Sequence, residues 1–235
     1  MTNFELLSFF SPEELAEAAA QRWLATLQGA ATEKPYCVAL SGGRIARQLF
    51  SAVVKQAKAQ RIKWDAVHFF WGDERCVPPA DPESNFGIAR LLLLQPLAIP
   101  EGQIHRIHGE DPPDFAANEA AAELCRTAPS SPNQQPLLNL IFLGMGEDGH
   151  VASLFPGEPD EIMSVYRAVT ASKPPPRRIT LGYATIAVAR QVWVLASGSG
   201  KKDALRQSLS PSAQTPLARI ISARHHTRIF SDISI

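Results

Sequence analysis

A titratable imidazole follows a glycine-rich turn in the middle of the chain. His150 ends the sequence GMGEDGH, which begins at Gly144 and has Gly146 near its centre. Glycine permits positive φ and lets backbone N–H groups approach a ligand closely. An imidazole exchanges protons near neutral pH and can act as a general base. The alternative is an ordinary α/β turn followed by a histidine with only a surface role.

The glycines at positions 144, 146 and 149 also match the dinucleotide-binding pattern GxGxxG. That pattern requires a long helix directly afterwards and an acidic residue roughly 20 positions further on, at the end of the next strand. Pro156 and Gly157 would end such a helix after about two turns, and the next predicted strand, Val165–Thr170, ends without an acidic residue. We therefore reject a nucleotide site here.

A second glycine turn, SGGR at residues 41–44, follows the predicted strand Tyr36–Leu40 and opens a helix expected to reach about Ala59. The free amides of a first helical turn, with the positive end of the helix dipole behind them, favour an anion. A tight turn without a ligand is the alternative. The pattern GxxxxGK[ST] is missing, which excludes a P-loop.

Charged side chains follow two further predicted strands. The sequence GDER (residues 72–75) comes after Val67–Trp71, and SGSGKK (residues 197–202) comes after Val192–Ala196 and precedes a helix to about Leu209. The proline-rich segment KPPPRR (residues 173–178) brings two guanidinium groups beside the predicted strand Ile179–Tyr183. Such groups at strand ends indicate a binding site, although surface turns and surface charge remain alternatives.

The strand that positions His150 is the apolar run Leu138–Leu143, which is too short for a helix and suits a strand buried on both faces. A last strand is predicted at Arg228–Ser231. Helices are predicted at residues 11–28, with Ser11 as the N-cap, and at residues 115–126 and 217–221. Another helix is predicted to follow the sequence DPESN and to end at about residue 94. This alternation predicts an α/β fold, and right-handed crossovers would bring the polar turns to one edge of the sheet.

The predicted edge gathers cations, carboxylates and glycine turns around one imidazole. This set indicates a small site for an anionic ligand, with phosphate as the obvious anion and a general base beside it. Its members are Gly42, Gly43, Arg44, Asp73, Arg75, Asp148, His150, Arg178 and Lys201.

Composition excludes several classes of protein. The chain has 235 residues, of which 45% are hydrophobic and 20% are charged, and Lys plus Arg equal Asp plus Glu at 23 each. This is the profile of a soluble globular protein, and the zero net charge argues against nucleic acid or an anionic membrane as a partner. The N-terminus lacks a basic region and a cleavage site, and no apolar run reaches membrane-spanning length.

The cysteines and the remaining histidines suggest neither disulfides nor metal. Three cysteines lie far apart in or beside apolar sequence, which indicates reduced thiols in a cytoplasmic protein. His105 and His108 have HxxH spacing, but Gly102 and Gly109 argue against the helix that a metal site would need. We expect no metal, and His225 and His226 are interpreted as surface residues.

Several motifs in the correct order resemble the 6-phosphogluconolactonase family, which belongs to a wider family with glucosamine-6-phosphate deaminase. They are SGG, WGDERCVP, DPESNFG, LGMGEDGHVASLFPG, PPPRRITL and SGSGKKDAL, and they extend over nearly the whole chain. The resemblance implies a Rossmann-like three-layer sandwich, with a mostly parallel sheet flanked by helices, as one domain over residues 1–235. It implies hydrolysis of 6-phospho-D-glucono-1,5-lactone in the pentose phosphate pathway by a monomer without metal or organic cofactor.

The resemblance also implies roles for the residues at the predicted edge. His150 would be the general base on the attacking water, and Asp148 or Asp73 would orient its imidazole. Arg75 would stabilise the oxyanion or hold sugar hydroxyls. The 6-phosphate and sugar would be bound by Gly42, Gly43, Arg44, Gly146, Arg178 and Lys201, with Lys202 as the alternative lysine.

Position 155 distinguishes between two kinds of relative, and position 44 departs from the family pattern. The deaminases have a glutamate five residues after the histidine, where this chain has Phe155, which cannot transfer a proton. This favours the lactonase over the deaminase, and a non-catalytic sugar-phosphate binder is the further alternative. The common SGGSTP is SGGRIA here, so Arg44 replaces the first hydroxyl that usually follows the glycines.

Overall fold

A six-stranded parallel sheet forms the centre of the computed structural model, which describes residues 3–29, 35–158 and 163–235. Its strands lie in the order β1 (Phe4–Ser8), β9 (Thr227–Ser231), β8 (Gln191–Ala196), β5 (Leu140–Gly144), β2 (Tyr36–Leu40) and β3 (Val67–Trp71). Every neighbouring pair is parallel. The α/β class with a mostly parallel sheet is confirmed.

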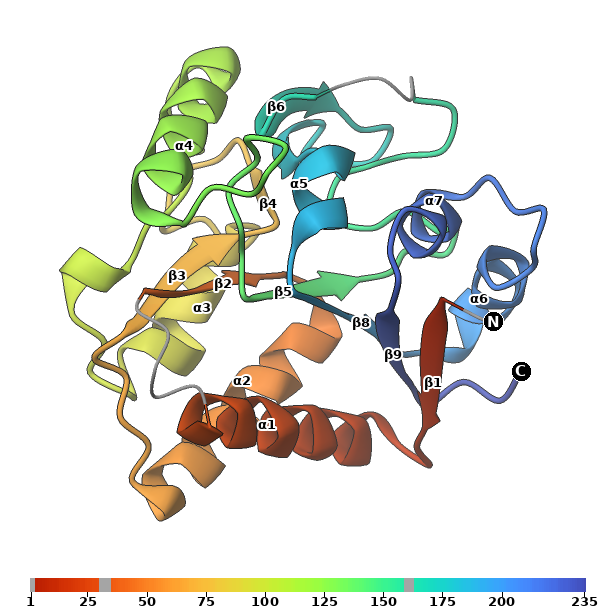
Figure 1. Ribbon diagram of the computed structural model, residues 1–235, viewed down its shortest axis with the longest axis horizontal. Helices are drawn as coiled ribbons and strands as arrows, with labels where there is room; N and C mark the ends of the chain where they lie inside the picture. The colour runs from red at the N-terminus through yellow and green to blue at the C-terminus, as the bar shows by residue number, and fades with distance from the viewer. Residues whose placement is uncertain (1–2, 30–34, 159–162) are drawn as a thin grey trace.

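Helices cover both faces of this sheet (Figure 1). The long helices α1 (Pro12–Gly29) and α2 (Arg44–Gln60) lie together on one face, and Ser11 accepts a hydrogen bond from the backbone N–H of Glu14, as expected of an N-cap. The remaining helices are α3 (Asn85–Ala89), α4 (Pro113–Thr127), α5 (Tyr183–Val188), α6 (Lys202–Ser208) and α7 (Pro216–Ser222). None of the described helices is long and apolar enough to cross a membrane.

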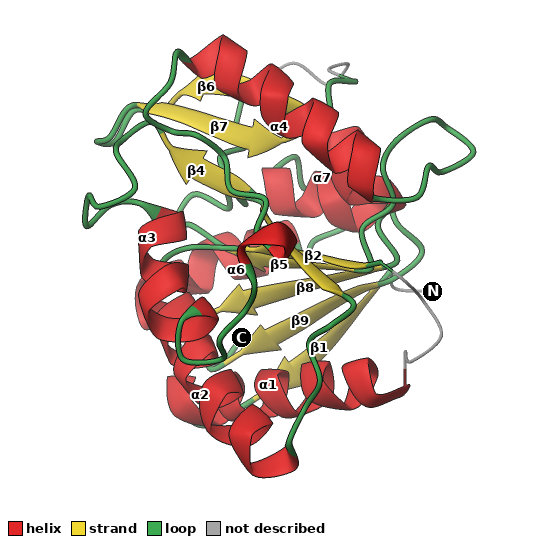
Figure 2. Cartoon of the chain, turned by 90° about the vertical axis from the view of Figure 1, so that its left-hand side faces the viewer, coloured by secondary structure: helices red, strands yellow, loops and turns green. Residues whose placement is uncertain are grey.

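A second, antiparallel sheet lies over the other face, beside α4 (Figure 2). It contains β4 (Asp73–Arg75), β7 (Arg177–Leu181) and β6 (Tyr166–Thr170) in that order. The connection between β6 and β7 is too short for a crossover, so these two strands form a hairpin instead of joining the parallel sheet.

Three sequence predictions are corrected, and one strand was missed. The predicted strand Ile179–Tyr183 is β7, which ends at Leu181, and α5 begins at Tyr183. The polar tip GDER contains a short strand, β4, because it pairs with β7. The helix expected to reach residue 94 is α3 followed by a π-helical turn at Arg90–Leu94. Strand β1 was not predicted, and it is held at the sheet edge by pairing with β9.

Aromatic side chains join α1 to the central strands. The ring of Trp23 meets Phe69 of β3 and Phe142 of β5 edge to face, with centroids 6.5 and 5.1 Å apart. Phe142 in turn meets Trp193 of β8 at 5.7 Å. Each such pair stabilises the fold by about 0.5–1.5 kcal/mol beyond the effect of burying its surface area. This packing fixes the strands whose C-terminal ends carry the polar turns.

Candidate active site

A cavity of about 120 Å³ lies where the C-terminal ends of β2, β3, β5 and β8 meet, which is the edge that open parallel sheets use for ligands. All the predicted site residues except Asp148 and Gly146 line it. Its lining consists of Ser41, Gly42, Gly43, Arg44, Ile45, Asp73, Arg75, Asn85, Gly144, Met145, His150, Ala152, Arg178 and Lys201. The expectation that the polar turns meet at one edge is therefore confirmed.

His150 is oriented by Asp148. The Nδ1 atom of His150 lies 2.5 Å from Oδ1 of Asp148, and the same oxygen accepts the backbone N–H of His150 at 3.2 Å. Burial alone would raise the pKa of Asp148, but these hydrogen bonds outweigh it and lower that pKa below its ordinary value. An ionised Asp148 favours the tautomer with the proton on Nδ1, in which Nε2 is the basic nitrogen.

The lack of a side chain at Gly146 leaves room for the imidazole of His150. A Cβ atom at residue 146 would lie 2.1 Å from both Nδ1 and Cε1 of His150. Any side chain at this position would displace the ring from Asp148. Gly146 therefore contacts the histidine and does not line the cavity.

Asp73 makes different contacts. Its Oδ2 atom accepts a hydrogen bond from the Ser153 hydroxyl at 2.7 Å, and its Oδ1 atom lies 3.3 Å from the amide nitrogen of Asn85. Of the two carboxylates proposed from the sequence, Asp148 alone bonds to His150 among the described residues. Asp73 faces the cavity from β4 and ties that strand to the loop after His150.

A buried carboxylate that the sequence did not reveal fixes the segment around Arg75. Glu74 accepts backbone N–H groups from Arg75 at 2.6 Å and from Asn85 and Phe86 at 2.8 Å each, and the hydroxyl of Ser84 at 3.1 Å. Burial raises the pKa of Glu74 to about 7, against the opposing effect of these hydrogen bonds. Glu74 thereby joins β4 to the start of α3, where Asn85 faces the cavity.

Asn85 was also missed, because in sequence it looks like part of a helix start. Its amide nitrogen donates to the backbone carbonyl of Asp73 at 2.9 Å, and its side chain packs directly on Gly42. It is 1% exposed. Asn85 therefore connects the turn after β2 with β4, and only the folded structure shows that connection.

Arg178 and Arg75 both line the cavity. Arg178 is 7% exposed, and it donates from Nε to the carbonyl of Pro175 at 3.1 Å. Burial lowers the pKa of Arg178, and neighbouring Arg75 lowers it further. Arg75 donates to the carbonyl of Glu83 at 2.8 Å and lies 3.2 Å from its carboxylate. The interpretation of Arg178 as surface charge is wrong.

Lys201 and Arg44 also line the cavity. Burial lowers the pKa of Lys201, and the charge of Arg44 lowers it further. Within residues 3–29, 35–158 and 163–235, no ion pair neutralises Arg44, Arg178 or Lys201. The first turn of α2 also begins here without a side-chain cap. An anion in this cavity would meet the buried guanidinium of Arg178, the half-buried ammonium of Lys201 and free backbone N–H groups together.

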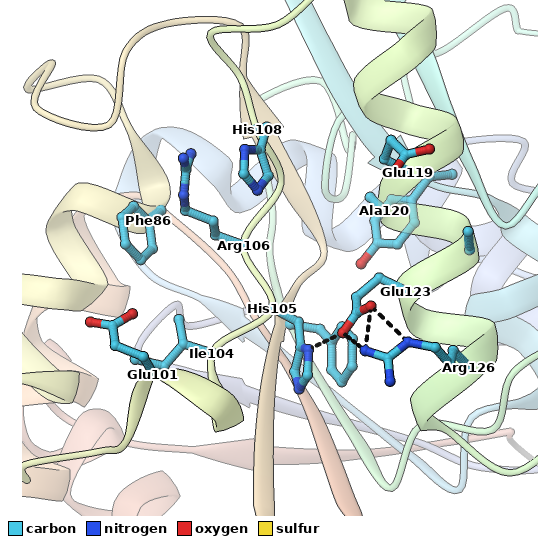
Figure 3. Close-up of a pocket in the computed structure, with 13 residues that line it drawn as sticks. Phe86, Glu101, Ile104, His105, Arg106, His108, Glu119, Ala120, Glu123 and Arg126 are labelled. Carbon is cyan, nitrogen blue, oxygen red and sulfur yellow. Dashed lines mark hydrogen bonds and ion pairs between the residues drawn. The ribbon is translucent and has the colours of Figure 1, made fainter.

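A larger cavity of about 540 Å³ lies beside α4, and its residues are drawn in Figure 3. Its cations are already paired: Arg106 lies 2.6 Å from Glu110, and Arg126 lies 2.7 Å from Glu123. His105 is bonded to the same Glu123 at 2.5 Å. Because these charges neutralise one another, the smaller cavity is the better candidate for an anionic substrate.

Comparison with known proteins identifies the family. Residues 11–230 match the family model described as glucosamine-6-phosphate isomerases/6-phosphogluconolactonase. A 6-phosphogluconolactonase of Haemophilus influenzae is 34% identical over 96% of both chains, and one of Mycobacterium tuberculosis is 38% identical over 86% of this chain and 85% of the relative.

Solved structures agree with this assignment. A 6-phosphogluconolactonase from Trypanosoma brucei superposes with a TM-score of 0.86 at 26% identity, covering 98% of this chain and 97% of its own. A monomeric glucosamine-6-phosphate deaminase, at 17% identity and a TM-score of 0.81, shares the fold over 97% of this chain and 96% of its own. The chain therefore belongs to the glucosamine-6-phosphate isomerase/6-phosphogluconolactonase family.

Proposed function

We propose that the chain hydrolyses 6-phospho-D-glucono-1,5-lactone to 6-phospho-D-gluconate, the lactone-opening step of the oxidative pentose phosphate pathway. The names of its relatives support this activity. The observation that carries it is one cavity that holds both the imidazole of His150, bonded to Asp148, and three cations that have no carboxylate ion pair within the described residues: Arg44, Arg178 and Lys201. A base beside an anion site fits a phosphorylated ester.

The proposed chemistry begins at Nε2 of His150. With its Nδ1 proton held by Asp148, the imidazole takes a proton from water at Nε2 while the water oxygen bonds to the lactone carbonyl carbon. Arg75 and nearby backbone N–H groups stabilise the resulting oxyanion. The ring C–O bond then breaks, and the imidazolium returns its proton to the departing hydroxyl. General base catalysis of this kind contributes about 10²–10⁴ in rate.

The 6-phosphate is held by the cations that line the cavity. Arg178 and Lys201 face the cavity from β7 and from the turn after β8, and Arg44 opens α2 beside Gly42 and Gly43. A phosphate offsets the burial and cation repulsion that lower the pKa values of Arg178 and Lys201. Its position orients the carbonyl toward His150.

The residue at position 155 supports the lactonase over the deaminase. Phe155 stands five residues after His150, where the deaminases have a glutamate, and its ring has no group that transfers a proton. Opening a lactone needs only the base and an oxyanion site, so this phenylalanine is compatible with the proposed reaction.

We propose further that the chain acts as one domain and as a monomer in the cytoplasm. One hydrophobic core includes residues of both sheets, and one copy supplies every group of the cavity. The three cysteines are free thiols, as in a reducing compartment.

The test is lactone hydrolysis followed by NMR, corrected for the spontaneous reaction, for the wild type and His150→Ala. His225→Ala removes an exposed histidine and is the matched control. We expect rapid turnover by the wild type and the control, and a loss of about 10²–10⁴ in His150→Ala. Binding of 6-phosphogluconate without turnover by the wild type would instead indicate a sugar-phosphate binder.

A further inference from the structure

The ring of Phe155 contacts two residues of the proposed active site at once. Its centroid lies 5.0 Å from that of the His150 imidazole, with the planes inclined at 47°. The guanidinium carbon of Arg178 lies 5.8 Å from the same centroid. Phe155 is half-buried and does not itself line the cavity. It therefore supports the base and one cation from outside the substrate space.

The residues just before Phe155 hold its loop against β4 and β7. Ser153, two residues earlier, donates its hydroxyl to Asp73 at 2.7 Å and its backbone N–H to the hydroxyl of Thr180 at 3.2 Å. Leu154 is fully buried, and its N–H bonds to the carbonyl of Val151 at 3.0 Å. These contacts hold the ring in one place relative to β4 and β7.

The charges that form during the reaction can be stabilised by an aromatic ring at this position. Arg178 is a permanent cation, and His150 becomes a cation when it takes a proton from water. The two charges share one cavity and repel each other. The face of an aromatic ring attracts cations within about 6 Å, whereas an aliphatic side chain of similar size does not. A ring in contact with both groups can stabilise them in the arrangement that the reaction needs.

We propose that Phe155 is a positioning residue whose aromatic ring, rather than its apolar bulk, fixes the positions of the His150 imidazole and the Arg178 guanidinium. Its kinetic effect rests on the function proposed above, but its contacts do not. Phe155→Leu keeps an apolar side chain without the ring, and Phe155→Tyr keeps the ring. Phe9→Leu is the control, because it removes the stacking of Phe9 on Phe230 in another part of the molecule.

The kinetic arm measures kcat and KM for lactone hydrolysis in these variants. We expect Phe155→Leu to lower kcat about 10-fold, equivalent to about 1.4 kcal/mol, and to raise KM severalfold, because both contacted residues lose their support. Phe155→Tyr and Phe9→Leu should stay within about twofold of the wild type. Wild-type kinetics in Phe155→Leu, or an equal loss in Phe155→Tyr, would overturn the proposal.

The spectroscopic arm does not depend on turnover. The ring protons of His150, assigned by their loss in His150→Ala, should carry a ring-current shift that persists in Phe155→Tyr and disappears in Phe155→Leu. Unchanged His150 shifts in Phe155→Leu would also overturn the proposal. If Phe155→Leu fails to fold, Phe155→Met replaces it in both arms with the same expected results. A wild type that shows the shift but no lactonase activity would refute the proposed function and leave the positioning role standing.

Discussion

The amide of Asn85 packs so closely on Gly42 that a Cβ atom at residue 42 would lie 1.9 Å from Oδ1 of Asn85. The turn after β2 and the start of α3 therefore fit together only when residue 42 is glycine. Because Asn85 also bonds to Asp73, this contact links two sides of the cavity.

Gly42→Ala should damage the site through this contact. Overpacking of this kind costs about 1–3 kcal/mol of unfolding free energy, and the displaced turn should lower kcat/KM at least 10-fold. Urea unfolding and lactone kinetics check both effects. Gly102→Ala is the control, because a Cβ there meets nothing within 4 Å. If the clash is the cause, Gly42→Ala combined with Asn85→Gly should recover part of the lost stability.

Asp148→Asn should reduce turnover while leaving the fold intact. The asparagine amide can present its N–H₂ group to Nδ1 of His150 and so favour the wrong tautomer. We expect kcat to fall about 10²–10⁴, the range of general base catalysis, with little change in the binding of 6-phosphogluconate by calorimetry. A wild-type kcat in this variant would show that His150 acts without Asp148.

Lys201→Met should weaken substrate binding more than it slows turnover. Loss of a hydrogen bond to a charged group costs about 1.5–3 kcal/mol, so the Kd for 6-phosphogluconate should rise by about 10- to 100-fold. Lys202→Met is the matched control, since Lys202 is exposed and does not line the cavity. A larger rise in Kd for Lys202→Met than for Lys201→Met would assign the phosphate contact to Lys202.

Acid should destabilise the protein through the histidine pair near α4. Nδ1 of His68 lies 2.8 Å from Nε2 of His105, whose Nδ1 is bonded to Glu123. Burial lowers the pKa of both histidines below 6.5, against the opposing effect of Glu123, while Arg126 lowers that of His105 further.

The unfolded chain therefore binds more protons than the folded chain as pH falls below about 6.5. The contribution of the pair to stability is complete above that pH and is lost as the pH falls through the lowered pKa values. Urea unfolding between pH 7.5 and 5 should reveal this loss by comparison with a variant that lacks both histidines, because Glu74, whose pKa is raised to about 7, has the opposite effect on the slope of unfolding free energy against pH in both proteins. The slope should be smaller in His68→Gln combined with His105→Gln, and an unchanged slope would contradict this explanation.

The sequence predicts the central strands well where local signals are strong. Tyr36–Leu40 and Val67–Trp71 have the predicted bounds, because short apolar runs end at polar turns. The antiparallel sheet is not visible in the sequence, since strand direction depends on which neighbour each strand meets. The alternation of strands and helices predicts that the polar turns meet at one edge, and the cavity is lined by the predicted groups except Asp148 and Gly146.

Pairwise contacts within the site are beyond sequence reasoning. Asp73 and Asp148 both precede His150, and only the folded distances show that Asp148 is its partner. Glu74 looked like one more charge at a strand tip, but it is 2% exposed and accepts four hydrogen bonds. Three of these bonds come from residues 84–86 at the start of α3, a contact that no periodicity reveals.

The pairing of β1 with β9 affects how the protein is made. The partner of β1 in the sheet, residues 227–231, is synthesised more than two hundred residues after β1 itself. During synthesis β1 stays unpaired, and its half-buried Phe4 and Leu6 lack their final packing. Contacts between such distant parts of a chain form slowly. The central sheet is therefore completed only after translation has passed the last strand.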